Sequence, residues 1–482
     1  MLTEELVALV KSAAARKCET KSIEFKKAAS GTPKRLFDTL SSFSNQTGGG
    51  IIIFGVDQEN DYEVCGVYDA QDVQVKVTEQ ANQMEPVVRP LFSVAEVDGK
   101  MVVSAEIAEC DVNERPCYYR GAGKLRGSYT RVGDADLPMT EYEIYSYEAY
   151  RRKIQDERRA VPEGLASEIQ DTMVQLFLSK ARIEKPNLAR LSDEDVLTLC
   201  GLYADNKPNL AGLLLFGLYP QASFPGFSIT AVVVPGYEIG NISDDGARFL
   251  DNKRIEGTIP DMIEGAMAFA QRNMKARTII DENGRRSDKS EYPIKAIREI
   301  ILNALIHRDY SVHTESSPIR LMFFTDRMEM ENPGGLYGRL TMDNLGKVGA
   351  DTRNPAIAAA LEILIDTENR FSGIPTIRKQ MQEAGLPAPV FDSSRGVFRV
   401  TLYNDAVKDG VKTEFVMGDL ETKILEYCKT PRTRAELSDL LQVSSISYMM
   451  TRYINPLIDS GELKMTIPNK PQSRYQRYYR ET

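Results

Sequence analysis

The stretch EIILNALIHRDY, at residues 299–310, carries two side-chain stripes at helical spacing. If a helix begins at about Ile294, its apolar stripe consists of Ile297, Ile301 and Leu305. The neighbouring polar stripe consists of Glu299, Asn303 and His307. One stripe can enter a core while the other faces a ligand, and a solvated polar face is the alternative. His307 and His313 are the only two histidines in 482 residues, so their position beside this stripe needs an explanation.

The composition is typical of a soluble globular protein, with 42% hydrophobic and 27% charged residues. A chain of 482 residues is too long for one core, so we expect several domains. We predict a mixed α+β and α/β multidomain fold with four blocks, at residues 1–149, 150–285, 286–405 and 418–482.

The net charge of −9 argues against a surface that binds nucleic acid or anionic membrane everywhere, so such contacts must come from local basic patches. The six cysteines are scattered without zinc-site spacing, which favours reduced thiols in the cytoplasm. The acidic start of the chain, with Glu4 and Glu5, and the lack of a long apolar run predict neither a signal peptide nor a membrane span.

Short apolar runs alternate with helical patterns along the first three blocks. In the second block we expect the runs at 211–220 and 227–234 to be short buried strands, and residues 255–275 to contain a helix. The polar stretch at 281–292 has no periodicity, which indicates a boundary or a loop. In the third block, residues 318–336 read as two strands around a turn.

The C-terminal block has the element order of a winged helix: helix, helix, turn, helix and wing. Thr433 and Glu436 form a capping-box pattern at the start of the second helix. In this interpretation the third helix turns Ser445, Tyr448 and Arg452 toward DNA, and the basic wing supplies Lys470, Arg474 and Arg477. A protein-interaction or purely structural module is the alternative.

The N-terminal block contains ETKSIEFKKA, SSFSNQTGGGIIIFGVDQEN and GSYTRVGDAD. Together these motifs resemble the Alba-like, Schlafen-type domain of many bacterial regulator-like proteins, over roughly residues 15–148. The resemblance implies an α/β domain that binds nucleic acid, for which we expect contacts from Lys26, Lys27 and Arg131.

Some Schlafen-type relatives use three carboxylates to hold a divalent metal ion for RNA cleavage. The matching residues here are Glu19, Glu24 and Asp57. Converging carboxylates suit phosphodiester hydrolysis, because the bound metal activates water and offsets charge on the leaving oxygen. The alternative is that Glu24 and Asp57 form ion pairs with Lys26, Lys27 or Arg131.

The polar stripe at 299–307, with ENPGGL at 331–336, RNPAIAAAL at 353–361 and the segment 368–391, resembles the ATPase-like half of the same family. The resemblance implies a GHKL-like α/β sandwich that binds ATP and Mg²⁺. Carried over, Glu299 would orient the attacking water if the domain is an ATPase, and Asn303 would ligate Mg²⁺ beside His307. Adenine and phosphate contacts would come from Asn332, Gly334, Gly335 and Gly373.

The sequence departs from the GHKL pattern at two of these positions. An Asp normally accepts the adenine amine where this chain has Asn332, and an amide oxygen accepts more weakly than a carboxylate. Phe371 stands where a small residue would let the backbone approach phosphate. We therefore expect nucleotide binding with at most slow hydrolysis. A buried imidazole of His307 bonded to Asp309 or Tyr310 also fits the sequence.

These observations predict a cytoplasmic, dimeric, DNA-binding transcriptional regulator that senses ATP and Mg²⁺. A metal-dependent nuclease that acts on RNA or DNA is the alternative. A degenerate ATPase that serves as an interaction scaffold is a third reading.

Overall fold

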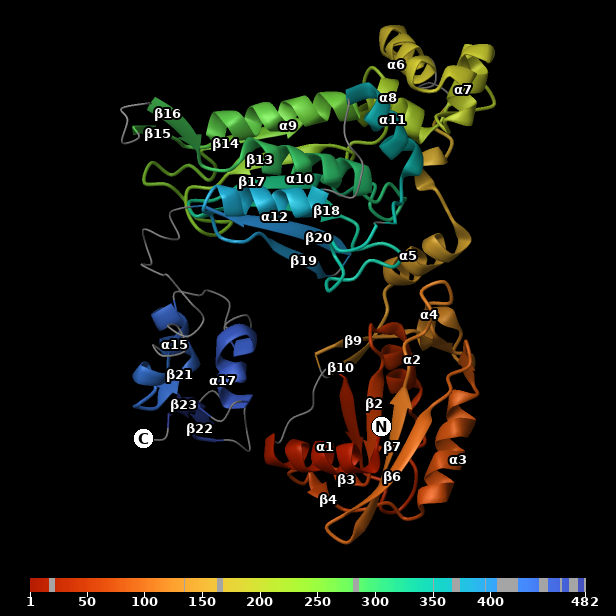
Figure 1. Ribbon diagram of the computed structural model, residues 1–482, viewed down its shortest axis with the longest axis vertical. Coiled ribbons are helices and arrows are strands. Elements are labelled where there is room, and N and C mark those ends of the chain that lie inside the picture. Colours follow the sequence, from red (N-terminus) through yellow and green to blue (C-terminus); the bar gives the residue numbers. More distant parts are fainter. Residues whose placement is uncertain are drawn as a thin grey trace. The chain divides into compact units, whose positions relative to one another are not determined.

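The computed structural model describes residues 1–16, 22–133, 135–162, 168–280, 286–349, 351–365, 373–394, 396–404, 424–441, 450–459, 462–467 and 476–480. The chain divides into one unit of Glu141–Val411 and a second unit made of Met1–Thr140 and Lys412–Thr482. Both contain helices and sheets, which confirms the predicted mixed α/β multidomain fold (Figure 1). No helix among the described residues is long and apolar enough to cross a membrane.

The N-terminal part is built on a four-stranded sheet in the order β1 (Ile23–Lys26), β2 (Gly50–Phe54), β7 (Lys100–Ile107) and β6 (Leu91–Val97). β1 and β2 are parallel, and the other pairs are antiparallel. Successive strand residues point to opposite faces. Ile53 accordingly joins one core with helix α1 (Thr3–Arg16), while Ile52 joins another with α2 (Phe37–Asn45) and α3 (Ala70–Ala81).

Short elements complete this part of the chain. The hairpin of β9 and β10 packs against α2. The remaining bounds are β3 (Val56–Asp57), β4 (Glu63–Val64), β5 (Met84–Glu85), β8 (Tyr118–Tyr119), α4 (Lys124–Gly127), β9 (Tyr129–Val132) and β10 (Ala135–Pro138).

The unit of residues 141–411 is built on a six-stranded sheet. Its order is β14 (Asp251–Ile255), β13 (Ile229–Val233), β17 (Ile319–Phe323), β18 (Arg327–Pro333), β20 (Val397–Tyr403) and β19 (Val390–Ser394). Only the β13 and β17 pair is parallel within it. The helices α9 (Ile259–Asn273), α10 (Ile294–His307) and α12 (Gly373–Glu383) lie along this sheet (Figure 1).

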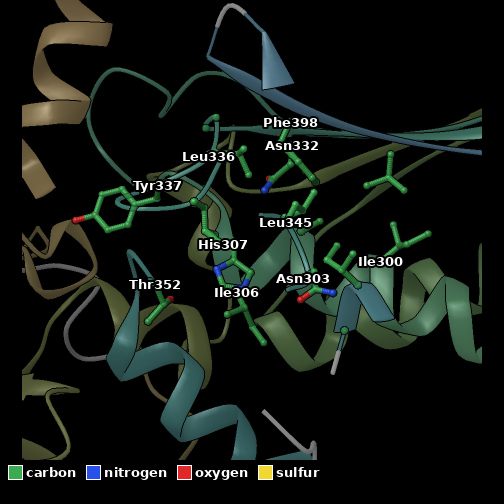
Figure 2. Close-up of a pocket in the computed structure, with 18 of the residues that line it drawn as sticks. Ile300, Asn303, Ile306, His307, Asn332, Leu336, Tyr337, Leu345, Thr352 and Phe398 are labelled. Atoms are coloured by element: carbon green, nitrogen blue, oxygen red, sulfur yellow. The ribbon is translucent and has the colours of Figure 1, made fainter. Parts of the chain in front are cut away.

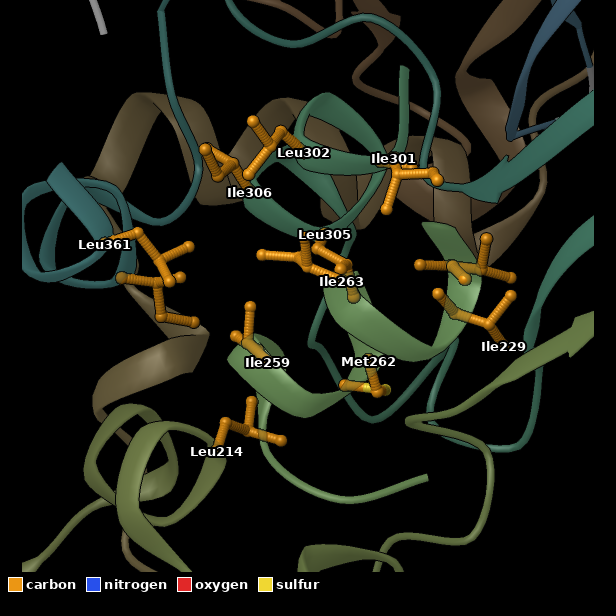
Figure 3. Close-up of a cluster of buried hydrophobic side chains, with 14 of the residues drawn as sticks. Leu214, Ile229, Ile259, Met262, Ile263, Ile301, Leu302, Leu305, Ile306 and Leu361 are labelled. Atoms are coloured by element: carbon orange, nitrogen blue, oxygen red, sulfur yellow. The ribbon is translucent and has the colours of Figure 1, made fainter. Parts of the chain in front are cut away.

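Helix α10 has the bounds that the two-stripe pattern predicts, and its apolar stripe is buried. Ile301 and Leu305 pack against Ile259 and Ile263 of α9 (Figure 3). Each fully buried side chain of this size stabilises the fold by roughly 1.5–3 kcal/mol. The core therefore fixes the rotation of α10, and with it the direction in which the polar stripe points.

One sheet joins the two blocks that we predicted to meet at residue 285. β13 and β14 come from the predicted 150–285 domain, and β13 pairs directly with β17 of the predicted 286–405 domain. The boundary at 285 therefore does not separate two cores. This pairing is non-local, and hydrophobic periodicity gives no signal for which distant strand becomes a neighbour.

A cluster of helices packs beside the sheet of this unit. It includes α6, α7, α8 and α11, which lie together in Figure 1. The bounds are α5 (Glu141–Arg152), η1 (Asp156–Arg158), α6 (Asp171–Glu184), η3 (Pro186–Arg190), α7 (Asp193–Leu199), β11 (Tyr203–Ala204), β12 (Lys207–Pro208), α8 (Leu210–Phe216), η4 (Pro220–Ala222) and α11 (Pro355–Ile365).

Two local predictions in this unit were wrong. The apolar run at 211–220 forms helix α8 rather than a strand, because the Asn209 side chain caps the helix and all seven residues of α8 are buried. A short apolar run cannot distinguish a buried strand from a buried helix. Part of the polar stretch at 281–292 forms strand β16 (Arg286–Ser290), which pairs with β15 (Ala276–Ile280).

The C-terminal part has a three-stranded sheet in the order β21 (Arg432–Thr433), β23 (Arg477–Tyr479) and β22 (Lys464–Met465). Its helices are α15 (Arg434–Leu441), a π-helical turn η5 (Met450–Ile454) and α17 (Asn455–Asp459). The predicted capping box is present, since Thr433 N donates to Glu436 Oε2 at 2.8 Å and Glu436 N donates to Thr433 Oγ1 at 3.2 Å. The predicted DNA contacts Ser445, Tyr448, Lys470 and Arg474, and the side chain of Arg452, lie outside the described residues.

Candidate functional site

A pocket of about 330 Å³ lies between helix α10, the start of α12 and the chain that leaves β18 (Figure 2). Volumes near 300 Å³ are at the lower end for small-molecule sites. The wall is mostly apolar, with Ile300, Leu345 and Phe398 among its side chains. Its polar groups come from segments far apart in the sequence, which the packing of α10 on the sheet brings together.

Seven residues predicted from the GHKL resemblance line this one pocket. They are Glu299, Asn303, His307, Asn332, Gly334, Gly335 and Gly373. The first three lie on α10, the next three lie at or just after the end of β18, and the last begins α12.

Gly373 lets the start of α12 approach the polar stripe of α10. A Cβ atom at this position would lie 2.7 Å from both Asn303 Nδ2 and Glu299 Oε1. Such a distance is shorter than van der Waals contact, so any other residue would displace the two polar side chains. The absence of a Cβ at Gly373 thus lets the start of α12 pack directly against Glu299 and Asn303.

Glu299 and Asn303 form a pair one helical turn apart. Asn303 Nδ2 donates to Glu299 Oε1 at 3.4 Å, which is a long hydrogen bond. Burial raises the pKa of Glu299, and the hydrogen bond from Asn303 opposes that rise. The Asn303 amide oxygen is a ligand type that Mg²⁺ accepts, and a carboxylate beside it can hold a water molecule.

His307 is half-buried at the same wall. Desolvation, with the nearby Arg353, lowers the pKa of His307 to about 4, so its imidazole is neutral at physiological pH. The alternative partners proposed from sequence are engaged elsewhere. The Tyr310 hydroxyl donates to Leu305 O at 2.8 Å, and the Asp309 carboxylate accepts from Ser311 N at 2.8 Å.

Asn332 presents a buried acceptor at the pocket wall. The residue is 5% exposed, and its Oδ1 has no hydrogen-bond partner within the described part of the chain. A buried oxygen without a partner costs about 1–3 kcal/mol. A ligand that offers an N–H donor, such as the amine of adenine, would satisfy it, so this residue fits the role that the resemblance implies.

A hydrogen-bonded cluster includes Arg353, which lines the pocket. Asp309 Oδ2 accepts from Tyr142 Oη at 2.7 Å and from Arg353 Nη1 at 3.2 Å. Burial favours a higher pKa for Asp309, but the Arg353 charge and the hydrogen bonds from Ser311 lower it overall. Arg353 Nη2 also donates to Gly335 O at 3.0 Å, which fixes the glycine turn after β18.

Three further residues that line the pocket were not predicted as site residues from the sequence. These are Tyr337, Asp351 and Arg353. Arg353 opens the RNPAIAAAL motif that we quoted for the resemblance, so a signal was present for it. Tyr337 and Asp351 belong to irregular chain, where periodicity cannot indicate which side chains turn inward.

The carboxylates of the N-terminal domain occur in ion pairs. Glu24 accepts from Arg131 at 2.8 Å and from Lys26 at 2.5 Å. Asp57 accepts from Lys27 at 2.5 Å, and the Lys27 contact lowers its pKa. Among the described residues no three His, Cys, Asp or Glu side chains are placed to share a metal ion. The third predicted ligand, Glu19, lies outside those residues.

Arg131, which we expected to contact nucleic acid, has a buried side chain in this structure. Its side chain is 1% exposed, and its two terminal nitrogens donate to Glu24 and to Asp136, the latter at 2.9 Å. Lys26 is 30% exposed and Lys27 is 61% exposed, so the ammonium groups are accessible although paired. Arg477 lies on β23, is exposed, and donates to Pro431 O at 3.3 Å.

Three family models match parts of the chain. "Schlafen, AlbA_2" matches residues 19–140, and "Putative ATP-dependent DNA helicase recG C-terminal" matches residues 316–402. "Filamentation induced by cAMP protein Fic-like, C-terminal domain" matches residues 422–480. Comparison with curated proteins finds no match.

Two solved structures are similar to the chain. The crystal structure of the DIP2311 protein from Corynebacterium diphtheriae is 20% identical, with 93% of this chain and 92% of that chain covered and a TM-score of 0.40. The second is a solution structure of the N-terminal domain of a putative ATP-dependent DNA helicase RecG-related protein from Nitrosomonas europaea. It is 27% identical, with 28% of this chain and 92% of that chain covered and a TM-score of 0.23.

Proposed function

We propose that this chain, which contains a Schlafen AlbA_2 domain and an ATPase-like domain of the helicase RecG C-terminal type, is a transcriptional regulator whose DNA binding responds to ATP and Mg²⁺. The observation that carries the proposal is the pocket beside α10. It combines an unpartnered buried acceptor, Asn332 Oδ1, with the Glu299 and Asn303 pair.

Each polar group of the pocket suits a different part of the nucleotide. Asn332 accepts the adenine amine, and the Asn303 amide oxygen contributes to Mg²⁺ binding. The phosphates are placed beside the backbone of Gly334, Gly335 and Gly373, which all line the pocket and carry no side chain between backbone and ligand. Mg²⁺ supplies charge neutralisation between the phosphates when it is bound.

Hydrolysis in this proposal is slow. Glu299 is the residue that would hold and orient an attacking water molecule. Slow turnover is expected from the two departures from the GHKL pattern, at Asn332 and Phe371, and not from the raised pKa of Glu299. Binding, rather than turnover, is the function for which the pocket is suited.

Helix α5 can couple ligand binding in the pocket to a conformational change elsewhere in the chain. Tyr150 Oη donates to Asp351 Oδ2 at 3.2 Å, and the Tyr150 ring packs edge-on against Tyr337 at 5.3 Å between centroids. Tyr142, also on α5, donates to Asp309. Asp351 and Tyr337 line the pocket rim, and α5 follows directly after the N-terminal domain in sequence. A nucleotide that moves the rim therefore biases α5, which is a population shift.

DNA contacts in this proposal come from the AlbA_2 domain, through Lys26 and Lys27, and from the C-terminal domain, through Arg477 and the basic wing. Phosphate contacts of this kind make affinity fall with rising salt concentration. The regulator acts as a homodimer in the cytoplasm, since regulators of this type commonly read two-fold symmetric sites.

The first test is calorimetric titration of ATP with Mg²⁺ into the wild type, Asn303→Ala and Asn252→Ala. Asn252 is exposed on edge strand β14 and provides the matched control. We expect the wild type and Asn252→Ala to bind equally. Asn303→Ala should lose tenfold or more in affinity, because a metal ligand is gone. No binding by the wild type would refute the proposal.

The nuclease alternative has a separate test. It predicts Mn²⁺-dependent cleavage of single-stranded RNA or DNA that Glu24→Ala abolishes. The ion pairs of Glu24 and Asp57 do not favour it, because a carboxylate held by Arg131 or Lys27 is already neutralised. Binding of nucleic acid without cleavage would leave the regulator as the function that fits.

A further inference from the structure

A second pocket, of about 270 Å³, lies among helices α6, η3, α7 and α11, apart from the one already described. Its wall is apolar and is formed by Phe177, Leu188, Leu199, Ala360 and Ile363. Leu199, which belongs to this wall, is 65% exposed. An apolar body placed in this pocket would remove that surface from water.

Two cations stand at the same pocket. Arg158 and Lys185 both line it, both are exposed, and neither forms an ion pair with another described residue. The Arg158 guanidinium lies over the backbone of Gly201, where a Cβ atom would be 2.6 Å from Nη2. A guanidinium can donate two parallel hydrogen bonds to one carboxylate.

We propose that this pocket binds a small hydrophobic carboxylate, with the apolar body against α6 and α11 and the carboxylate on Arg158 and Lys185. The volume restricts the ligand to a short body, on the scale of a medium-chain fatty acid or a single aromatic acid. Two basic side chains in the lining match a single anionic head, which distinguishes this ligand from a neutral lipid and from a multiply charged nucleotide.

Cys200 provides a reporter of occupancy within the pocket. Its thiol is half-buried at the wall, and Cys65 and Cys110 are half-buried elsewhere in the chain. A ligand in the pocket should shield Cys200 from an alkylating reagent and leave the other two thiols as reactive as before. Mass spectrometry of the peptides reads the three alkylation rates from one sample.

The probe is octanoate, compared with butyrate and with octan-1-ol, on the full chain. We expect octanoate to bind by calorimetry and to slow alkylation of Cys200 alone. Each methylene removed should weaken binding about fourfold, so butyrate binds far more weakly. Octan-1-ol keeps the body but lacks the charge, and should bind about tenfold more weakly than octanoate.

Three variants test the assignment of the head and the body. Arg158→Gln should weaken octanoate about tenfold and leave octan-1-ol unchanged. Arg190→Gln is the matched control, since Arg190 is an exposed arginine of η3 that does not line the pocket. Ala359→Phe, at an exposed position of α11 that does line it, should block both ligands.

The proposal is wrong if octanoate leaves the alkylation of Cys200 unchanged. It is also wrong if Arg158→Gln and Arg190→Gln bind octanoate equally well. Neither result depends on whether the first pocket binds ATP, so the two proposals fail separately.

Discussion

The N-terminal domain and the α10 pocket both bury polar side chains, but they satisfy them in different ways. In the N-terminal domain Arg131 and Glu24 pair with each other, and further partners surround them. In the pocket, Asn332 Oδ1 has no partner among the described residues, and the bond from Asn303 to Glu299 is long. Groups that satisfy one another stabilise a fold, whereas groups left open on a cavity are available to a ligand.

The largest expected effect is on the paired cluster. Arg131→Met would leave buried Glu24 and half-buried Asp136 without their shared cation, and breaking a buried ion pair costs roughly 3–5 kcal/mol. We expect a clearly lower calorimetric melting temperature for the full chain. The control is Lys76→Met, which removes an exposed pair with Asp72 and should cost less than about 1 kcal/mol. Equal melting temperatures for the two variants would contradict the structural role of Arg131.

The next effect concerns Glu157, a buried acid whose carboxylate accepts hydrogen bonds from backbone N–H groups. Its carboxylate accepts from Ala356 N at 2.8 Å and from Ile357 N at 2.9 Å, at the start of α11. Burial raises the pKa of Glu157 to about 7, although these hydrogen bonds oppose the rise. In the unfolded chain a glutamate loses its proton near pH 4.3. Between about pH 4.3 and about pH 7, therefore, Glu157 is protonated in the folded state and ionised in the unfolded state.

The pH dependence follows from that difference. The contribution of Glu157 to folding stability is fully present below about pH 4.3 and falls, by on the order of 3 kcal/mol, as pH rises to about 7. Glu157→Gln cannot titrate. Between about pH 4.3 and about pH 7, the melting temperature of the wild type should therefore fall relative to that of this variant. Calorimetric scans of both proteins at several pH values measure it. Parallel curves would show that Glu157 titrates normally.

A smaller effect is expected at the unpartnered acceptor. Asn332→Leu removes a buried oxygen that makes no hydrogen bond, so the stability without ligand should rise by about 1–3 kcal/mol. Affinity for ATP should fall about tenfold, with loss of the preference for ATP over GTP. Asn332→Asp keeps an acceptor and should keep the preference. Competition titrations with both nucleotides decide, and unchanged preference in Asn332→Leu would place adenine elsewhere.

The smallest effect is expected at helix α5. Tyr150→Phe removes the hydrogen bond to Asp351 but keeps the ring contact with Tyr337. ATP affinity should change less than threefold, while the change in DNA affinity that ATP causes should shrink by about 0.5–1.5 kcal/mol. DNA binding measured with and without ATP and Mg²⁺ gives this difference. Tyr203→Phe, a half-buried tyrosine near β12, is the control.

Local patterns predicted much of the fold. Helix α10 and strands β17 and β18 occur where periodicity placed them, because one face of each must be buried. Helix α8 and strand β16 were missed, since a short apolar run or a polar run carries no decisive period. The resemblance to Schlafen and ATPase-like domains was confirmed by two family models.

The sequence predicted which residues form the candidate site better than it predicted which residues surround them. The stripe of Glu299, Asn303 and His307 follows from helical spacing, and the structure sets it beside Gly373. The Asp309 cluster with Tyr142 and Arg353 depends on three segments that meet only after folding. The pairing of Arg131 with Asp136 requires the β9–β10 hairpin, so the sequence could not show that Arg131 is buried.

The segment from Arg353 to Ala356 belongs to both pockets. Arg353 lines the first and Ala356 lines the second, and Asn354 between them donates to Ile306 O and Arg308 O at the end of α10. A ligand that displaces this segment in one pocket would also change the other pocket, and any coupling between two binding sites is reciprocal. Whatever factor a carboxylate applies to the affinity for ATP, ATP must apply to the affinity for the carboxylate. If both proposed ligands bind, the segment from Arg353 to Ala356 makes each pocket a sensor of the other pocket's occupancy.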